Sequence, residues 1–166
     1  MEAQPAALRY RRPNEADYEP IVRVLDDWWS GRSQDAGLPR LWLRHFAGTS
    51  WLAEGEDGRL AGFLVAFHSP DQPDTTVCHI VGVDPNRRRR GIGSELYVRC
   101  FADATAVGRT RVTAVCWPGN RIGLDFHRAL GFEVETGPDR ENLYGTPAIA
   151  GYDQDRDDRA VLIRRL

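Results

Sequence analysis

The chain has 166 residues and a formal net charge of −2. This length suits one domain with a full core, so we expect a single domain over residues 1–166. A dedicated nucleic-acid binder is usually strongly basic, and no apolar stretch approaches the roughly 20 residues of a membrane-spanning helix. The N-terminus also lacks a signal-peptide core, so we expect a cytoplasmic protein with no nucleic-acid or membrane partner.

The N-terminal third predicts a strand followed by a helix. Residues 8–12 alternate in polarity, Pro13 ends that strand, and Asn14 is a suitable helix N-cap. Apolar residues then recur at helical spacing and define one buried face. They are Tyr18, Ile21, Val22, Leu25, Trp28 and Trp29. The two tryptophans either pack against a sheet or line a substrate cleft, and core packing is favoured.

A polar segment separates this helix from a second, shorter one. Residues 30–38 contain glycine and polar residues, so we expect a mobile loop there. Pro39 can open a short helix that carries Trp42 and Phe46. Strands at 51–54 and 60–67 follow, joined by the strong hairpin signal Asp57-Gly58. The next strand covers 76–83.

The centre of the chain predicts a strand, a loop and a helix. The apolar run that begins at Val77 stops at Pro85, and four consecutive arginines, residues 87–90, follow it. Gly91 and Gly93 then leave backbone N–H groups unshielded at the start of a helix, where the helix dipole attracts anions. We therefore expect a phosphate-bearing cofactor over this loop. A nucleic-acid ligand is the weaker alternative, because exposed aromatic residues do not interleave with the arginines.

The spacing of this loop selects among phosphate-binding motifs. A Walker loop needs a lysine after its glycine, and a dinucleotide fingerprint needs glycine or alanine where Leu96 stands. The remaining pattern, Arg88-x-x-Gly91-x-Gly93, resembles the pyrophosphate-binding signature of the GNAT superfamily of acetyl-CoA-dependent N-acetyltransferases. The resemblance implies acetyl-CoA as cofactor, coenzyme A as product, and pantetheine contacts from the backbone of Val81 and Val83. It assigns the pyrophosphate to Arg88, Arg89, Arg90, Gly91, Ile92, Gly93 and Ser94.

A second segment resembles the same superfamily. A helix ending near residues 107–108 leads to a strand at 111–117, parallel to the strand at Val77. Asn120 then caps a helix over 122–130 that Gly131 closes in the left-handed conformation. The run Asn120-x-x-Gly123-x-x-Phe126-His127-x-x-Leu130-Gly131-Phe132 matches the family pattern except at His127.

His127 occupies the position where the family most often has the tyrosine that protonates the leaving thiolate. The resemblance implies that Asn120 binds the pantetheine arm and that His127 is the acid. Residues seven apart lie nearly on one helix face, which is compatible with both roles. The alternative is that His127 is a surface residue of an amphipathic helix.

Short strands at 132–135 and 159–164 complete the chain. The segment between them, residues 136–158, is rich in Gly, Pro and Asp, and a loop of that length is usually a binding loop or a subunit contact. We therefore expect a homodimer through this C-terminal segment. Cys78, Cys100 and Cys116 lie far apart in apolar segments, so we expect buried thiols and no metal site.

These patterns predict a mixed α/β (α+β) single domain. A mostly antiparallel sheet of six or seven strands is splayed at the cofactor strand and flanked by about four helices. The resemblance covers roughly residues 8–166 and implies direct acetyl transfer to a primary amine of a small molecule or peptide. In relatives a glutamate on the strand before the loop often removes the amine's proton. This strand has none, so His79 is the candidate base, and an inactive acyl-CoA-binding module is the alternative.

Overall fold

The computed structural model describes residues 7–29 and 37–166, so most of the loop expected at 30–38 lies outside the described residues. The chain divides into two compact units. The N-terminal unit comprises Met1–Phe67 and His79–Asp103, and the C-terminal unit comprises His68–Cys78 and Ala104–Leu166. The unit boundaries fall inside β3, β4 and α3.

The order of elements matches the expected α/β fold. The elements are β1 (Arg9–Arg11), η1 (Glu15–Asp17), α1 (Tyr18–Trp28), α2 (Leu41–His45), η3 (Ala47–Thr49), β2 (Trp51–Glu54), β3 (Leu60–His68), β4 (Thr75–Val83), η4 (Pro85–Arg87), α3 (Ile92–Ala106), β5 (Arg111–Cys116), α4 (Arg121–Ala129), β6 (Glu133–Val134), β7 (Glu141–Leu143), β8 (Thr146–Ala148) and β9 (Ala160–Arg165). Seven strands are hydrogen-bonded in the order β1-β2-β3-β4-β5-β9-β6. β4 and β5 are parallel, as predicted, whereas β1–β2, β2–β3, β5–β9 and β6–β9 are antiparallel.

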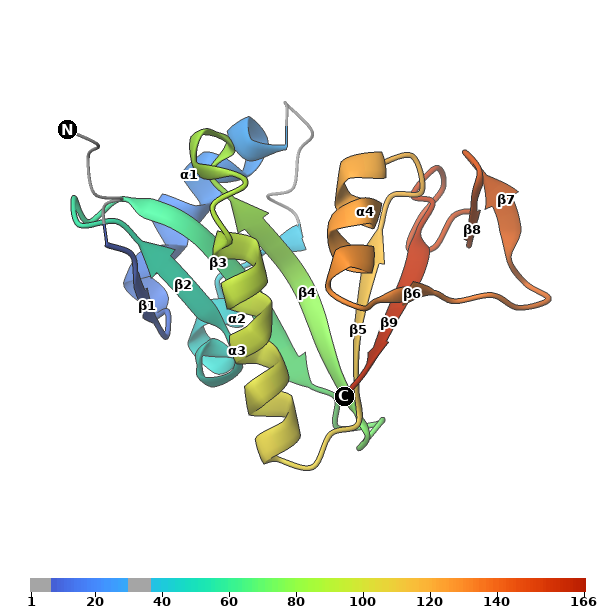
Figure 1. Cartoon of the computed structure of the whole chain (residues 1–166), viewed down its shortest axis with the longest axis horizontal. Helices are drawn as coiled ribbons and strands as arrows, with labels where there is room; N and C mark the ends of the chain where they lie inside the picture. Colours follow the sequence, from blue (N-terminus) through green and yellow to red (C-terminus); the bar gives the residue numbers. More distant parts are fainter. Residues whose placement is uncertain (1–6, 30–36) are drawn as a thin grey trace. The chain divides into compact units, whose positions relative to one another are not determined.

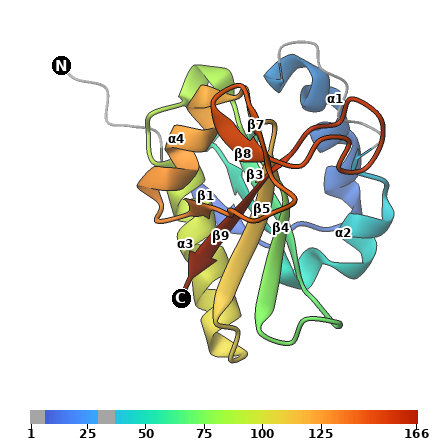
Figure 2. The ribbon, with the colours of Figure 1, turned by 90° about the vertical axis from the view of Figure 1, so that its right-hand side faces the viewer.

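Helices cover both faces of the strands in the N-terminal unit. α3 lies on one face, and α1 and α2 lie on the other (Figures 1 and 2). Neighbouring residues of β3 face these two layers, as the alternation of a strand requires. A Cβ on Gly62 would lie 2.9 Å from Ile92 of α3, whereas Phe63 stacks on Trp28 of α1 with ring centroids 5.8 Å apart. Gly62 therefore permits the close approach of α3.

The core of the N-terminal unit lies between α1, α2 and the strands. Its buried members are Ile21, Leu25, Trp28, Leu38, Leu43, Leu52, Phe63 and Val65. Trp29 packs on the same side, because a Cβ on Gly82 of β4 would lie only 2.6 Å from its indole. Both tryptophans thus pack against the sheet, which is the alternative that the sequence favoured.

A polar contact joins the first strand to the start of the first helix. Asn14 accepts a hydrogen bond from Ala16 N–H and forms a capping box with Asp17. Arg11 donates to both carboxylate oxygens of Asp17, each at 2.8 Å. Burial alone would raise the pKa of Asp17, but the bonds from Arg11 and from Asn14 N–H outweigh it and lower that pKa. An ion pair and side-chain hydrogen bonds therefore stabilise the start of the helix.

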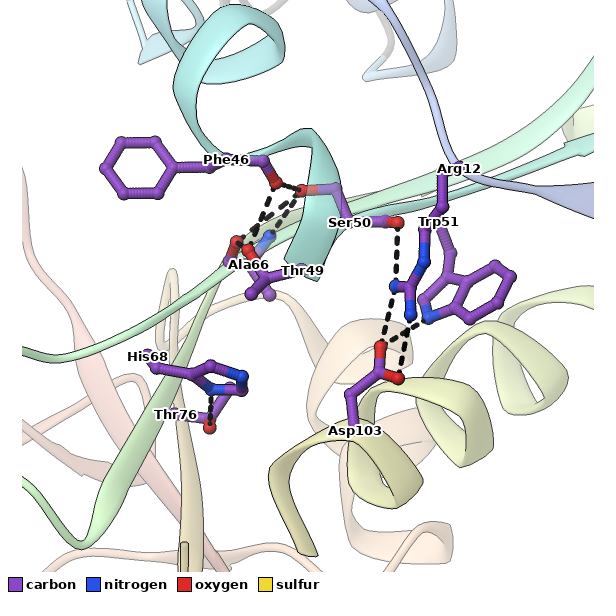
Figure 3. Close-up of polar contacts among 9 residues, drawn as sticks. All are labelled: Arg12, Phe46, Thr49, Ser50, Trp51, Ala66, His68, Thr76 and Asp103. Carbon is purple, nitrogen blue, oxygen red and sulfur yellow. Dashed lines mark hydrogen bonds and ion pairs between the residues drawn. The ribbon is translucent and has the colours of Figure 1, made fainter. Parts of the chain in front are cut away.

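A second polar cluster connects Arg12, the residue directly after β1, with β2 and α3 (Figure 3). Asp103 accepts two hydrogen bonds from the Arg12 guanidinium, at 2.7 and 2.8 Å, and one from Nε1 of Trp51 at 2.8 Å. The guanidinium also lies 3.7 Å from the centroid of the Trp51 ring. This geometry combines a bidentate ion pair with a cation–π contact.

We expect Asp103→Ala to lower the free energy of unfolding by about 1–3 kcal/mol, because it leaves the Arg12 and Trp51 donors without this acceptor. Urea unfolding measures the change. The control is Asp125→Ala, which breaks an exposed pair with Arg128 and should cost less than about 1 kcal/mol. Equal losses in the two variants would contradict a structural role for the Asp103 cluster.

The C-terminal unit places α4 against β5 and β9 (Figures 1 and 2). The loop expected at 136–158 contains two strands that the sequence analysis did not predict, because β7 and β8 form a hairpin there. Its turn residues Tyr144 and Gly145 both have positive φ, 54° and 80°. Each strand has only three residues, and Pro147 is the middle residue of the second. Tyr144 also stands where such turns favour Asn or Asp, so the usual sequence signals of a hairpin are weak. The homodimer through this segment stays a prediction.

Two negative findings hold for residues 7–29 and 37–166. None of the helices there is long and apolar enough to cross a membrane. Those residues also contain no group of three or more His, Cys, Asp or Glu side chains placed to hold a metal ion. Cys78, Cys100 and Cys116 are buried thiols.

Candidate active site

The loop after β4 has the backbone that its glycines and arginines predict. Asp84 caps η4 by accepting a hydrogen bond from Asn86 N–H at 2.9 Å, and Pro85 occupies the first position of that turn. Arg89 and Gly91 then adopt positive φ, 62° and 77°. α3 begins directly afterwards at Ile92. The chain thus reverses sharply between the strand and the helix.

This loop fits the pyrophosphate of a coenzyme. The first hydrogen bond of α3 runs from Glu95 N–H to the Gly91 carbonyl at 2.9 Å. The N–H groups of the three residues before Glu95 therefore lie outside the i→i−4 ladder of the helix, at the positive end of its dipole. Apart from its two chain neighbours, none of the residues that the structure describes places an atom within 4 Å of where a Cβ on Gly91 would lie, and the arginines at 88–90 are exposed. The loop therefore combines backbone N–H donors, the positive charge of the arginines and open space beside Gly91.

Arg88 also contacts the first helix. Its Nη2 donates to the carbonyl of Trp28 at 3.1 Å, at the C-terminal end of α1. A cation is favourable at that end of a helix dipole. This contact connects the loop after β4 to α1, although Arg88 is exposed as a residue, like Arg89 and Arg90.

The end of β4 is shaped by a glycine between two valines. A Cβ on Gly82 would lie 2.6 Å from Trp29 and 2.9 Å from Phe63, so a larger residue would displace both rings. Val81 and Val83 flank this position and are half-buried. Their assigned backbone contacts to pantetheine stay a prediction.

His79 lies on the same strand and is held by α2 and by the residue at 37. Its ring stacks on Trp42 with centroids 4.1 Å apart and planes at 9°. Its Nε2 contacts the carbonyl oxygen of Gly37 in a short hydrogen bond. The indole of Trp42 in turn packs against Phe46 and Phe67, with centroid distances of 4.9 and 5.6 Å. The imidazole of His79, the predicted base, is therefore held by the stack on its face and by the hydrogen bond at its edge.

In the C-terminal unit, Asn120 caps α4 as predicted. Its Oδ1 accepts a hydrogen bond from Gly123 N–H at 2.9 Å. A Cβ on Gly123 would lie 2.5 Å from Nδ2 of Asn120, which explains why the motif has a small residue three positions after the asparagine. Gly131 closes the helix with φ of 86°, also as predicted.

His127 is buried, so the alternative that it is a surface residue is wrong. Only 6% of the residue is exposed, and its ring meets Phe126 and Phe132 edge-on at 5.3 and 5.2 Å. Nδ1 lies 2.7 Å from the carbonyl of Gly123. Burial lowers the pKa of His127 below its usual value, and the bond to Gly123 opposes that shift without cancelling it.

The predicted site residues therefore form two groups. The loop residues, the two valines of β4 and His79 belong to the N-terminal unit, and Asn120 and His127 belong to the C-terminal unit, where both bond to Gly123. Sequence reasoning missed Trp42 and Gly37 as partners of His79. No local signal could have identified them, because the contacts join residues about 40 positions apart on different elements.

The sequence is similar to a family of acetyltransferases and to individual acetyltransferases. The profile of the acetyltransferase (GNAT) family matches residues 13–132. The L-2,4-diaminobutyric acid acetyltransferase of Streptomyces coelicolor is 33% identical over 152 residues, which cover 88% of this chain and 86% of that protein. The enzyme of the same name from Streptomyces avermitilis is 31% identical over 148 residues, covering 81% of this chain and 83% of that protein.

Solved structures agree on the fold. Ard1 from Thermoplasma volcanium superposes with a TM-score of 0.76 at 16% identity, over 96% of this chain and 98% of that chain. The diaminobutyrate acetyltransferase EctA from Paenibacillus lautus, solved with L-2,4-diaminobutyric acid and coenzyme A, gives 0.65 at 24% identity, over 95% and 94%. With the family profile spanning both predicted motifs, this chain belongs to the GNAT acetyltransferase family and is an acetyl-CoA-dependent acyltransferase.

Proposed function

We propose that this protein acetylates a primary amine of a small diamino acid similar to L-2,4-diaminobutyric acid. One observation carries the choice of acceptor: the enzymes of Streptomyces coelicolor and Streptomyces avermitilis described above have that compound in their names, and their matches cover more than 80% of this chain. A small amino acid is a narrower acceptor class than the small molecule or peptide that the sequence motifs imply.

Bound acetyl-CoA supplies a thioester, whose carbonyl carbon bonds to the amine nitrogen while the carbon–sulfur bond breaks and its electron pair leaves with sulfur. The protein's own residues then have two tasks besides binding. One group takes a proton from the amine, because only a neutral amine attacks, and another returns a proton to sulfur.

His79 is the proposed base. It lies on β4, the strand that leads into the cofactor loop, and the contacts to Trp42 and Gly37 hold its ring in place. A neutral imidazole has one nitrogen with a free electron pair, and that nitrogen can accept a proton. This position takes the role that relatives often give to a glutamate on this strand.

His127 is the proposed acid, and its contact with the Gly123 carbonyl determines when it can donate a proton. The Gly123 carbonyl can only accept, so Nδ1 of His127 is the nitrogen that bears hydrogen in the neutral ring. Nε2 then carries a proton only when the ring is charged. Because burial lowers the pKa of His127, the charged form is favoured on the acid side of neutrality. Donation from Nε2 should therefore strengthen as the pH falls.

The cofactor contacts follow the two motifs. Residues 88–94 supply N–H donors and positive charge to the pyrophosphate, and the backbone of Val81 and Val83 together with Asn120 holds the pantetheine arm. The free donors at the start of α3 and the open space at Gly91 support the first of these assignments.

An acceptor panel tests the proposed function. We expect release of free coenzyme A thiol with L-2,4-diaminobutyrate, with kcat/KM at least about 100-fold higher than with L-2-aminobutyrate, which lacks the second amine. L-Ornithine and L-2,3-diaminopropionate vary the distance between the two amines, and mass spectrometry with NMR identifies the acetylated nitrogen.

Two results would contradict the proposal in different ways. Equal turnover of L-2-aminobutyrate and L-2,4-diaminobutyrate would remove the diamino acid as the preferred acceptor. Acetyl-CoA binding without turnover of any amine in a broad panel would favour the inactive acyl-CoA-binding module.

A further inference from the structure

We propose that Trp42 is a positioning residue that, with the carbonyl of Gly37, holds His79 as the Nε2–H tautomer, so that Nδ1 takes the amine's proton. The catalytic part of this inference rests on the proposed function, whereas the tautomer and its dependence on Trp42 are properties of the folded chain alone. Three features of the N-terminal unit carry the argument.

The first feature is the hydrogen bond at the edge of the ring. Nε2 of His79 contacts the carbonyl oxygen of Gly37, and a carbonyl oxygen only accepts. The hydrogen of this bond must therefore belong to Nε2. A neutral imidazole carries one such hydrogen, so Nδ1 holds the available electron pair. His127 shows the opposite arrangement, because its Nδ1 faces the carbonyl of Gly123.

The second feature is the stack at the face of the ring. The His79 and Trp42 planes differ by only 9° at a centroid distance of 4.1 Å. Trp42 is itself held by Phe46 and Phe67, whose rings also contact each other at 5.5 Å. A rotation of the imidazole out of this plane would lose the stack, and a half-turn would move Nε2 away from the Gly37 carbonyl. The two contacts therefore select one orientation.

The third feature is that both contacts come from one short segment. Gly37 and Trp42 are five residues apart, and Leu38 between them is fully buried in the core cluster. This buried leucine anchors the segment in the core of the N-terminal unit. Neither the indole nor the peptide carbonyl titrates, and the two phenylalanines behind Trp42 are uncharged, so a substitution at Trp42 changes the position of His79 without adding or removing a charge.

Long-range 1H–15N correlation of protein labelled with 15N-histidine tests the tautomer directly. The chain has four histidines, and a His79→Gln spectrum assigns the His79 signals by their loss. We expect the Nε2–H pattern for His79 and the Nδ1–H pattern for His127, which serves as the internal reference. An Nδ1–H pattern for His79 in the wild type would overturn the assignment without reference to any activity.

Trp42→Leu and Trp42→Phe then test positioning. Leucine removes the stacking partner, so we expect mixed His79 tautomer signals and a kcat lower by about tenfold to 10²-fold, with little change in KM for acetyl-CoA. Phenylalanine retains an aromatic face, so Trp42→Phe should keep the wild-type tautomer and most of kcat. Circular dichroism confirms that both variants fold.

The outcomes separate this inference from the proposed function. An unchanged tautomer and kcat in Trp42→Leu would overturn the positioning role, as would loss of kcat with a purely wild-type tautomer pattern. If Trp42→Leu shifts the tautomer while the wild type turns over no amine, positioning stands and the proposed function fails. If Trp42→Leu does not fold, the wild-type spectrum and Trp42→Phe test the positioning role instead. Mixed His79 tautomer signals in Trp42→Phe would then contradict the inference that an aromatic face at position 42 is enough to hold His79.

Discussion

Acetyl-CoA is expected to raise the unfolding temperature of the wild type and to leave that of Gly91→Glu unchanged. At about 100 times its dissociation constant, a ligand that binds only the folded state stabilises it by about 2.7 kcal/mol. Gly91 has φ of 77° and open space around it. A glutamate there would place a carboxylate at the start of α3, where the proposed pyrophosphate site needs the N–H donors. Thermal unfolding followed by tryptophan fluorescence, with and without millimolar acetyl-CoA, measures the shift.

Gly58→Glu is the matched control for this experiment. Gly58 also has positive φ, 71°, and also has no atom within 4 Å of a built Cβ, but it lies in the turn between β2 and β3. Both variants therefore carry the same backbone strain and the same added charge. We expect Gly58→Glu to keep the acetyl-CoA shift. If both variants lose the acetyl-CoA shift, the loss reflects general destabilisation of the fold and not a blocked pyrophosphate site.

A retained shift in Gly91→Glu would place the pyrophosphate away from this loop. Gly93→Glu is a companion variant that should also lose the shift. Gly93 is buried, however, so a glutamate there perturbs packing as well as binding. Gly91 is the sharper test because its exposed position separates binding from folding.

Much of the fold follows from local patterns in the sequence. β2 and β3 were predictable because apolar runs flank Asp57-Gly58, and Gly58 does adopt positive φ in that turn. The start of α1 was predictable from Asn14, whose side chain forms the expected cap. The β7–β8 hairpin was not, because its turn places Tyr144 in a conformation that tyrosine rarely adopts and sequence rules do not anticipate.

The candidate site divides in the same way. The backbone of the loop at 88–94 was predictable because its glycines, arginines and helix start lie within a few consecutive residues, whereas its contact with the cofactor stays a prediction. The surroundings of the two histidines were not. His79 depends on Trp42 of α2, and the burial of His127 depends partly on Phe132, which returns after the helix has ended. Contacts of this kind arise from tertiary packing, which the period of one helix or strand does not encode.

The acid proposed for the reaction makes the second large prediction. We expect the kcat of the wild type to rise, relative to that of a variant whose acid does not titrate, as the pH falls toward the lowered pKa of His127. The two proteins share the proposed base His79, and only the charged imidazole of His127 carries a proton on Nε2. His127→Phe should reduce kcat by about 10²-fold or more, the scale for loss of a general acid. His127→Tyr is that reference variant: it should be partly active, because a phenol with a pKa near 10 keeps its proton throughout this range.

Stability must be followed in parallel, because the same group affects folding. The pKa of His127 is lower in the folded chain than its unperturbed value of about 6.5 in an unfolded one. Between these two values the unfolded chain binds more protons, so the free energy of unfolding falls as the pH decreases through that window. His127→Phe should lack this contribution. Urea unfolding at each assay pH shows which rates belong to fully folded protein.

The decisive comparison is the pH profile of kcat for the wild type, His127→Phe and His127→Tyr at saturating acetyl-CoA. A rise toward acid that is present only in the wild type would support proton donation by His127. If all three proteins give the same rate and profile, His127 contributes packing between Phe126 and Phe132 and nothing to proton transfer. Water or a tyrosine then supplies the proton, and the exposed phenols of Tyr144 and Tyr152, 59% and 42% exposed as residues, would be the next positions to substitute.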